Sequence, residues 1–260
     1  MSIIVAIPAR LASTRLPRKV LLDLGGKPVV QHVWERASQM RLASRVVILA
    51  DSEELANTAQ NFGAEVILTP PECPSGTARL ASALEKLPGN FFLNVQGDEP
   101  CIEPTLLDAL ATRWHDTQCE LVTAVSRIHD TTRLQNPNVV KVVRGESGQA
   151  LYFSRSPVPY RRGLSMEKWL DDNSTPYWAH IGVYGYTRKT LASYPALPPT
   201  RLEVIESLEQ LRFIEHGKIF QTVETNYHPI AIDTAEDLEN ARKLFGNHPQ
   251  QHHPREHGKT

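Results

Sequence analysis

The 260-residue chain is 41% hydrophobic and carries 28 basic and 29 acidic residues, which gives a net charge of −1. This balance is typical of a globular protein and excludes a global positive field that would attract nucleic acid or an anionic membrane, so any affinity for phosphate must be local. The three cysteines, Cys73, Cys101 and Cys119, form no C-x-x-C pair, and the first apolar run, residues 3–7, is too short for a signal peptide or a membrane span. We therefore expect a cytoplasmic protein that binds no nucleic acid and does not insert into a membrane.

Strands and helices alternate in the first half of the chain. The β-branched run at residues 3–7 is typical of a buried parallel strand, and Val30, Val33 and Ala37 recur at helical spacing. The predicted strands cover residues 3–7, 45–50, 65–68 and 91–95, and the predicted helices cover residues 29–37, 53–62, 77–87 and 104–115. Such alternation predicts βαβ crossovers, and therefore an α/β fold with a mostly parallel sheet flanked by helices.

The regular alternation of strands and helices does not continue in the second half of the chain. The predicted strands are 121–126, 139–144, 151–154, 178–186 and 219–224, and the predicted helices are 202–215 and 235–245. A glycine-containing turn makes 139–154 a hairpin, and residues 157–176, with three prolines, are an excursion from the core. We expect one domain over residues 1–245, with a β-rich excursion at 139–178 as a candidate dimer arm, and a disordered His- and Pro-rich tail at 246–260.

The loop after the first predicted strand, residues 8–19, is rich in cations and hydroxyls. It contains Arg10, Ser13, Thr14, Arg15, Arg18 and Lys19. Ligands of parallel sheets bind in loops at the carboxyl ends of strands, here after Ile7, Leu68, Val95 and Tyr186. Arginine forks hold phosphate oxygens in pairs, and a lysine adds a point charge, so the loop can wrap a triphosphate. A solvated basic loop is the alternative. No P-loop and no G-x-G-x-x-G motif occurs in the sequence.

Two distant aspartates follow predicted strands. Asp98 lies on a sharp turn after the strand at 91–95, and Asp233 follows an apolar pair before the last predicted helix. Mg²⁺ binds through one or two carboxylates and keeps water and phosphate oxygens as its other ligands, so the pair is a candidate metal clamp. The alternatives are a turn residue for Asp98 and a helix cap for Asp233.

Two further groups have ordinary structural alternatives. Ser75-Gly76-Thr77 precedes a helix, where backbone amides favour an anion or a carbonyl, but Thr77 could equally be a plain N-cap. His180 and Tyr184 are four apart on a predicted strand and therefore share a face, where they could bind a ligand or pack as half-buried side chains.

These motifs resemble the sugar-activating cytidylyltransferases, and in particular the 3-deoxy-manno-octulosonate (Kdo) cytidylyltransferase family. The matching segments are residues 8–19, 26–28, 75–79, 94–100, 150–157, 180–184, 206–212 and 232–238, which run in the family's order over nearly the whole chain. The segments 8–19 and 26–28 identify only the superfamily, whereas the later segments point to Kdo rather than to sialic acid.

The resemblance implies a Rossmann-like nucleotidyltransferase fold of the glycosyltransferase-A-like type and the transfer of CMP from CTP to the anomeric hydroxyl of Kdo, for lipopolysaccharide biosynthesis. It implies Mg²⁺ held by Asp98 and Asp233, a homodimer, and catalytic roles for Arg10, Lys19 and Asp98. The implied nucleotide-binding residues are Pro8, Ala9, Arg10, Ser13, Arg15, Lys19, Ser75, Gly76, Thr77, Arg79 and Gln96. The implied sugar-binding residues are Arg155, His180, Tyr184, Glu209 and Gln210.

The chain departs from the family pattern at two places. Arg18 stands where the family usually has glycine, which predicts strain if the position needs a positive φ. In the loop that reads the base, Pro74 departs from the usual pattern and Ala78 replaces an acidic residue. Three alternatives therefore stay open: another acidic sugar such as 8-amino-Kdo or a nonulosonic acid, a different NTP, or a nucleotide sensor without turnover.

Overall fold

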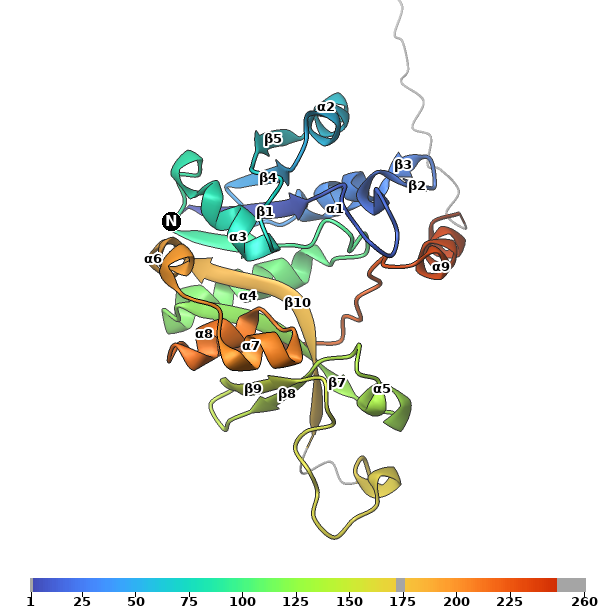
Figure 1. The fold of residues 1–260 in the computed structure, drawn as a ribbon, viewed down its shortest axis with the longest axis vertical. Coiled ribbons are helices and arrows are strands. Elements are labelled where there is room, and N and C mark those ends of the chain that lie inside the picture. The colour runs from blue at the N-terminus through green and yellow to red at the C-terminus, as the bar shows by residue number, and fades with distance from the viewer. Residues whose placement is uncertain (1, 172–175, 247–260) are drawn as a thin grey trace, which may run out of the picture.

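A computed structural model describes residues 2–171 and 176–246 of the chain (Figure 1). The predicted tail lies outside these residues except for Gly246, which is not part of a tail because it ends helix α9 (Ala235–Gly246). Within the described ranges, no helix combines the length and the apolar character that crossing a membrane requires.

The first half of the chain forms the parallel part of a central sheet. The strands are β1 (Ile3–Ala9), β4 (Arg45–Ala50), β5 (Glu65–Leu68) and β6 (Phe91–Asn94), and the helices are α1 (Val29–Ala37), α2 (Glu53–Asn61), α3 (Gly76–Ser82) and α4 (Pro104–Thr117). β1 pairs in parallel with β4 and β6, and β4 pairs in parallel with β5, so the predicted crossovers are confirmed. Short elements precede α1: the 3₁₀ helix η1 (Lys19–Leu21) and the two-residue strands β2 (Asp23–Leu24) and β3 (Lys27–Pro28). The helix predicted at 77–87 is instead α3 followed by the 3₁₀ helix η2 (Leu84–Lys86).

The second half adds the long strand β10 (Tyr177–Thr187), which is antiparallel to its neighbours, together with β7 (Leu121–Ile128) and β11 (Phe220–Thr225), which pair with each other in parallel. Its other elements are α5 (Thr131–Gln135), β8 (Lys141–Arg144), β9 (Ala150–Ser154), η3 (Met166–Lys168), α6 (Arg188–Ser193), η4 (Tyr194–Ala196), α7 (Arg201–Glu206) and α8 (Gln210–Glu215). The strand order is β11-β7-β10-β6-β1-β4-β5. β10 runs antiparallel to β6 and β7, and the predicted β8–β9 hairpin pairs with β10.

Two predictions about this half are wrong. The helix predicted at 202–215 is broken, because Ser207 adopts a left-handed conformation with φ 52° and ends α7. The loop after Tyr186 does not lie with the other strand-end loops, because β10 is antiparallel and its last residue, Thr187, pairs with Phe91 at the start of β6. The carboxyl end of β10 therefore lies at the opposite edge of the sheet.

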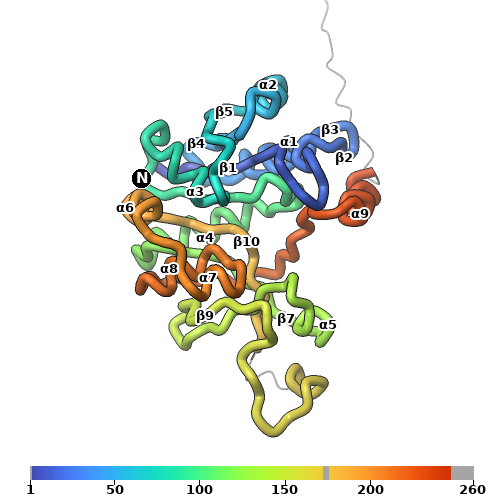
Figure 2. Tube along the Cα trace, viewed as in Figure 1, coloured from blue at the N-terminus to red at the C-terminus, as the bar shows by residue number. Residues whose placement is uncertain are grey.

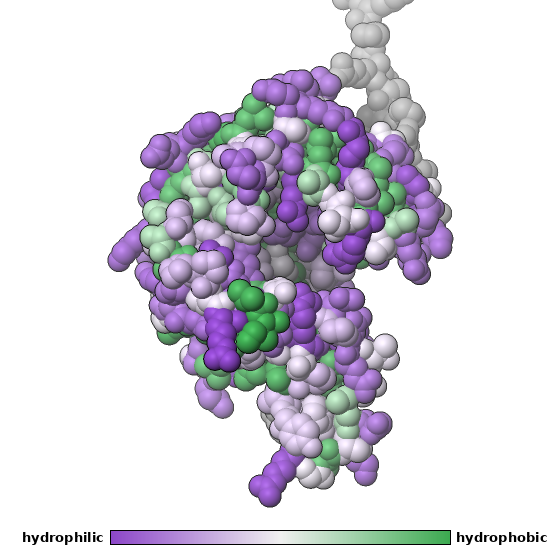
Figure 3. All heavy atoms as spheres, in the orientation of Figure 1, coloured by the Kyte–Doolittle hydropathy of each residue, from purple (hydrophilic) through white to green (hydrophobic). Residues whose placement is uncertain are grey.

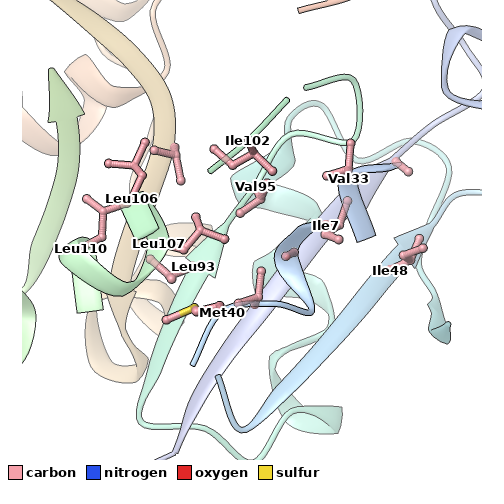
Figure 4. Packing of buried hydrophobic residues seen from close by; sticks show 14 of the residues in the cluster. Ile7, Val33, Met40, Ile48, Leu93, Val95, Ile102, Leu106, Leu107 and Leu110 are labelled. Atoms are coloured by element: carbon pink, nitrogen blue, oxygen red, sulfur yellow. The ribbon is translucent and has the colours of Figure 1, made fainter. Parts of the chain in front are cut away.

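Buried apolar layers cover both faces of the sheet. Side chains along β1 alternate between them, with Ile3, Val5 and Ile7 in one layer and Ile4 and Ala6 in the other. Figure 4 shows the first layer, in which Val33 of α1 and Leu107 of α4 pack near Ile7 and Leu93. α3, α6 and α8 contribute to the second layer. Because helices cover much of both faces, the loops at the carboxyl ends of the parallel strands are the first place to look for a nucleotide site.

Candidate active site

A cavity of about 540 Å³ lies where the loops after β1, β5 and β6 meet. Its lining residues are Pro8, Ala9, Arg10, Ala12, Ser13, Thr14, Arg15, Lys19, Val20, Cys73, Ser75, Gly76, Arg79, Gln96, Gly97, Asp98 and Asp233. Every residue of the predicted nucleotide-binding set except Thr77 lines it, and so do both predicted metal ligands. The distant sequence motifs therefore share one cavity at the carboxyl ends of three parallel strands.

The basic loop is held in shape by its own backbone and by Asp51, which directly follows β4. The amide of Leu11 donates to Oδ2 of Asp51 over 2.9 Å, and the amide of Arg18 donates to the carbonyl of Leu11 over 3.0 Å. Arg18 closes this loop in the left-handed conformation, with φ 58°. The strain predicted for an arginine at this glycine position is therefore present. The Arg18 side chain pairs with exposed Glu54.

Lys19 bridges the two predicted metal ligands. Its Nζ donates to Oδ2 of Asp98 and, over 2.7 Å, to Oδ1 of Asp233, while Nη2 of Arg15 lies 3.0 Å from Oδ2 of Asp233. Burial favours the neutral form of Asp233, but Lys19 and Arg15 outweigh this effect and lower its pKa. Two carboxylates and two cations thus meet at one wall of the cavity.

Asp98 and Asp233 are brought together by backbone contacts. The amide of Ile232 donates to the carbonyl of Asp98 over 3.0 Å, which joins the segment before α9 to the loop after β6. Figure 2 follows this C-terminal segment as it passes beside the first loop, although Lys19 and Asp233 are 214 positions apart. Gly97 lets the loop after β6 pass close to the end of β1, because a Cβ at this position would lie 3.0 Å from the carbonyl oxygen of Pro8.

The cap of α9 does not use Asp233. The amide of Thr234 donates to Oδ2 of Asp237 over 2.8 Å, and the amide of Asp237 donates to Oγ1 of Thr234 over 3.2 Å. This reciprocal cap supplies the helix terminus, so the alternative reading of Asp233 as a cap is wrong. Its carboxylate is left to Lys19 and Arg15.

The loop before α3 does not use Thr77 as its N-cap, which was the structural alternative for this segment. Ser75, rather than Thr77, is the N-cap of α3, since its Oγ accepts from the amide of Ala78 over 3.1 Å. Thr77 is buried, and its hydroxyl lies 2.9 Å from the hydroxyl of Tyr186. Arg79 is 2% exposed, and its Nη1 donates to Oγ1 of Thr69 over 2.6 Å and to the carbonyl of Pro70 over 3.0 Å. Its guanidinium therefore braces the loop after β5 at the base of the cavity.

Comparisons with known proteins agree on one family. A family model described as "Cytidylyltransferase" matches residues 4–225. The 3-deoxy-manno-octulosonate cytidylyltransferase of Chlorobaculum tepidum is 42% identical over 249 residues, which cover 94% of this chain and 98% of that protein. The protein of the same name from Actinobacillus pleuropneumoniae serotype 7 is 43% identical over 252 residues, which cover 94% of this chain and 100% of that protein. The chain belongs to the 3-deoxy-manno-octulosonate cytidylyltransferase family.

Solved structures support the same assignment. A structure described as CMP:2-keto-3-deoxy-manno-octonic acid synthetase complexed with CTP matches the chain with a TM-score of 0.88 at 36% identity, and the match covers 95% of this chain and 99% of that one. A putative glucose-1-phosphate thymidylyltransferase from Bacillus anthracis, at a TM-score of 0.67 and 15% identity, shares the fold. The predicted nucleotidyltransferase fold of the Kdo cytidylyltransferase family is thereby confirmed.

Three residues of the predicted Kdo subsite lie together on one face of β10. The ring centroids of His180 and Tyr184 are 5.3 Å apart, which confirms the predicted shared face. The hydroxyl of Tyr184 lies 3.4 Å from Oε1 of Gln210, and Nε2 of His180 lies 3.0 Å from Oγ1 of Thr123. None of these three residues lines the cavity. On the same strand as His180 and Tyr184, however, Tyr186 contacts Thr77 of α3, which directly follows the cavity-lining Gly76.

The other two predicted sugar residues have different surroundings. Oε1 of Glu209 is buried without a hydrogen-bond partner among the described residues. Burial raises the pKa of Glu209, although the nearby hydroxyls of Thr77 and Ser75 oppose the shift. Arg155 donates to the carbonyls of Glu206 and Pro137, so its guanidinium also fixes the junction between α7 and α8. Their roles in a Kdo cytidylyltransferase stay predictions.

A third carboxyl group, which the sequence patterns did not single out, directly follows the predicted metal ligand Asp98. Glu99 is 6% exposed, and its Oε2 lies 3.5 Å from the hydroxyl of Tyr227. Burial, followed by the charge of Asp98, raises the pKa of Glu99 to about 8. Glu99 is therefore largely uncharged at neutral pH. The adjacent acidic residues in Gly97-Asp98-Glu99 were the available signal.

Proposed function

We propose that this chain transfers CMP from CTP to the anomeric hydroxyl of Kdo, which yields CMP-Kdo and pyrophosphate for lipopolysaccharide biosynthesis. The observation that carries the proposal is the meeting of Arg10, Arg15 and Lys19 with Asp98 and Asp233 around one cavity. The relatives at 42% and 43% identity carry the name of this activity, and the solved relative at 36% identity was complexed with CTP.

The protein contributes alignment and charge to the reaction. Arg10 is exposed in the cavity, and its guanidinium, like that of Arg15, can hold two phosphate oxygens of the triphosphate. The anomeric oxygen of the sugar attacks the α-phosphorus in line, and the bond from this phosphorus to the pyrophosphate oxygen breaks. Lys19 and the arginines neutralise the charge that develops on the departing pyrophosphate.

We propose Mg²⁺ as the cofactor, held by Asp98 and Asp233. Oδ2 of Asp98 and Oδ1 of Asp233 already face one cationic atom, the Nζ of Lys19, so the donor pair suits a cation. Among the described residues no three His, Cys, Asp or Glu side chains converge on a metal position, and Mg²⁺ ordinarily completes its shell with water and phosphate oxygens. When bound, the ion supplies positive charge that screens the triphosphate from the incoming hydroxyl.

We assign the sugar to the cluster of His180, Tyr184 and Gln210, with Glu209 and Arg155 beside it. Kdo brings a carboxylate and several hydroxyls, which require donors and acceptors in a partly buried place. Nε2 of Gln210 is buried without a partner among the described residues and is therefore a donor for a sugar oxygen. The ring of Phe153 in β9 lies 5.0 Å from that of His180, and Arg155 directly follows the end of this strand.

Pyrophosphate release tests the proposal, with CTP, Mg²⁺ and Kdo each omitted in turn. We expect release only when all three are present. Replacing Kdo by 8-amino-Kdo or a nonulosonic acid, and CTP by each other NTP, should give at most a few per cent of the rate. CTP binding without pyrophosphate release would overturn the enzymatic function in favour of a sensor.

We also propose that the protein is a homodimer. Val204 and Ile205 of α7 are each 67% exposed, and Leu151 of β9 is 52% exposed. Figure 3 shows an apolar patch over α7 with hydrophilic side chains around it. Clustered exposed apolar side chains are typical of protein interfaces. Light scattering should give twice the chain mass, and Ile205→Glu should halve it; a monomeric wild-type protein would contradict the proposal.

We also propose a cytoplasmic location, which the state of the thiols supports. Cys73, Cys101 and Cys119 are all free, which is typical of a reducing compartment. Cell fractionation should recover the protein with cytoplasmic markers, and recovery with an extracytoplasmic fraction would contradict this.

A further inference from the structure

The Nζ of Lys19 lies between the two carboxylates that we assign to the metal. The side chains of Lys19 and Asp98 are only 14% and 20% exposed, so this contact is largely shielded from water. Lys19 donates to one oxygen of each aspartate, and the remaining Oδ2 of Asp233 receives Arg15 over 3.0 Å. In this arrangement two positive side chains already balance the two negative ones.

A metal ion needs the same oxygen atoms. Mg²⁺ coordinates carboxylate oxygens at about 2.0–2.1 Å, which is shorter than the contacts of an ammonium nitrogen, so the two cations cannot occupy one position. Displaced Lys19 would have to face Arg10 and Arg15, which line the same cavity. Like charges brought together there repel one another, and this repulsion opposes the binding of a metal ion alone.

We propose that Lys19 is an internal counter-cation which orients Asp98 and Asp233 in the nucleotide-free protein, and that it leaves them only when a triphosphate accepts its ammonium group. Metal and CTP then bind in a coupled manner, because the nucleotide brings the negative charge that Lys19 requires after the exchange. The inference rests on the proposed function for the identity of the nucleotide, but it concerns binding rather than turnover.

The surroundings of Lys19 favour a movement of the side chain alone. Its backbone begins η1, directly after Arg18, whose amide is bound to the carbonyl of Leu11. On the acidic side, the amide of Ile232 fixes Asp233 to the Asp98 backbone, and Asp237 and Thr234 fix the following helix turn. Both backbones are therefore anchored, while the four-carbon stem of lysine can turn from the carboxylates toward the cavity.

Mn²⁺ binding, measured by electron paramagnetic resonance, tests the inference without turnover. The wild-type protein should bind Mn²⁺ about tenfold more tightly in the presence of a CTP analogue with a methylene bridge between the α- and β-phosphates than in its absence. In Lys19→Met and Lys19→Gln, Mn²⁺ alone should bind about tenfold more tightly than to the wild-type protein, and the analogue should add little. Lys27→Met, which removes a lysine paired with Glu35, is the matched control and should behave as the wild type.

Unchanged Mn²⁺ affinity in both folded Lys19 variants, verified by circular dichroism, would overturn the inference. So would an undiminished effect of the analogue on Mn²⁺ binding in these variants. Pyrophosphate release by the wild-type protein is measured separately. Lys19-dependent coupling without pyrophosphate release in the presence of Kdo would refute the proposed function but leave the inference intact. Pyrophosphate release without such coupling would support the proposed function and overturn the inference.

Discussion

The hydroxyls of Thr77 and Tyr186 lie 2.9 Å apart in the interior, and this contact joins α3 to β10. Thr77 follows the two cavity-lining residues Ser75 and Gly76, whereas β10 carries His180 and Tyr184. The positions of the proposed nucleotide and sugar subsites are therefore linked by one buried hydrogen bond.

Tyr186→Phe should lower the free energy of unfolding by about 1 kcal/mol, since it leaves the Thr77 hydroxyl unpaired. It should also raise KM for CTP severalfold, because the loop before α3 loses this support. Urea denaturation and steady-state kinetics measure the two effects. Tyr177→Phe is the control: it removes a hydroxyl that donates to the carbonyl of Pro159 over 2.9 Å, away from the cavity-lining residues. It should cost similar stability, and an equal rise in KM for CTP would contradict the assigned link.

Asp98→Asn and Asp233→Asn should each reduce kcat by about 10²–10³, because each removes a charged contact to the reacting groups. The fold should persist, since both side chains lie at the cavity wall and are partly exposed. Pyrophosphate release gives the rates, and circular dichroism checks the fold. Asp116→Asn, at an exposed surface position, should keep the full rate. Near-normal turnover in Asp98→Asn would remove that residue from the catalytic set.

Arg18→Gly should be more stable than Arg18→Ala by about 1 kcal/mol. Both variants lose the Arg18–Glu54 contact, but only alanine keeps a side chain in the left-handed conformation, which is costly for non-glycine residues. Urea denaturation of both variants isolates this strain from the ion pair. At an ordinary right-handed position the order would be reversed, so a more stable alanine variant would contradict the observed conformation.

The buried ring of His180 should make the free energy of unfolding depend on pH. Burial lowers the pKa of the His180 ring, whereas an unfolded histidine titrates near 6.5. Below about pH 6.5 the unfolded chain therefore binds more protons, and stability falls as the pH falls, by at most roughly 1.4 kcal/mol per pH unit. Above that pH the group has no further effect. Denaturation between pH 5 and 7.5 should show this slope reduced in His180→Gln but not in His115→Gln, whose ring is exposed. Equal slopes in the two variants would exclude His180 as the cause.

The parallel part of the fold could be predicted because one pattern decides it. Buried β-branched runs such as β1 alternate with amphipathic helices, and parallel strands place their following loops at one edge. From this rule alone, Lys19 and Asp98 could be predicted to lie in the same site. Asp233 was predicted at the end of a strand, but residues 226–234 form no strand. Its alternative role as a cap could be rejected only from the contacts of Thr234 and Asp237.

Other features depend on contacts that sequence spacing does not encode. The apolar spacing of 202–215 fits a helix, yet Ser207 turns the chain and leaves Ile205 in solvent. The direction of β10 is decided by its pairing with β6 and β7, which a single strand pattern does not reveal. Arg79 looked like a base-reading side chain, but only the structure shows its donors turned to Thr69 and Pro70.

The separation of 214 positions between Lys19 and Asp233 also has a consequence for synthesis of the protein on the ribosome. The basic loop is synthesised before its second carboxylate partner, which follows it by 214 positions. Until Asp233 has been synthesised, Asp98 is the only one of the two aspartates that the nascent chain contains. Competence for the proposed nucleotide chemistry should therefore appear only after Asp233 has been synthesised, and premature termination before Asp233 should yield an inert product.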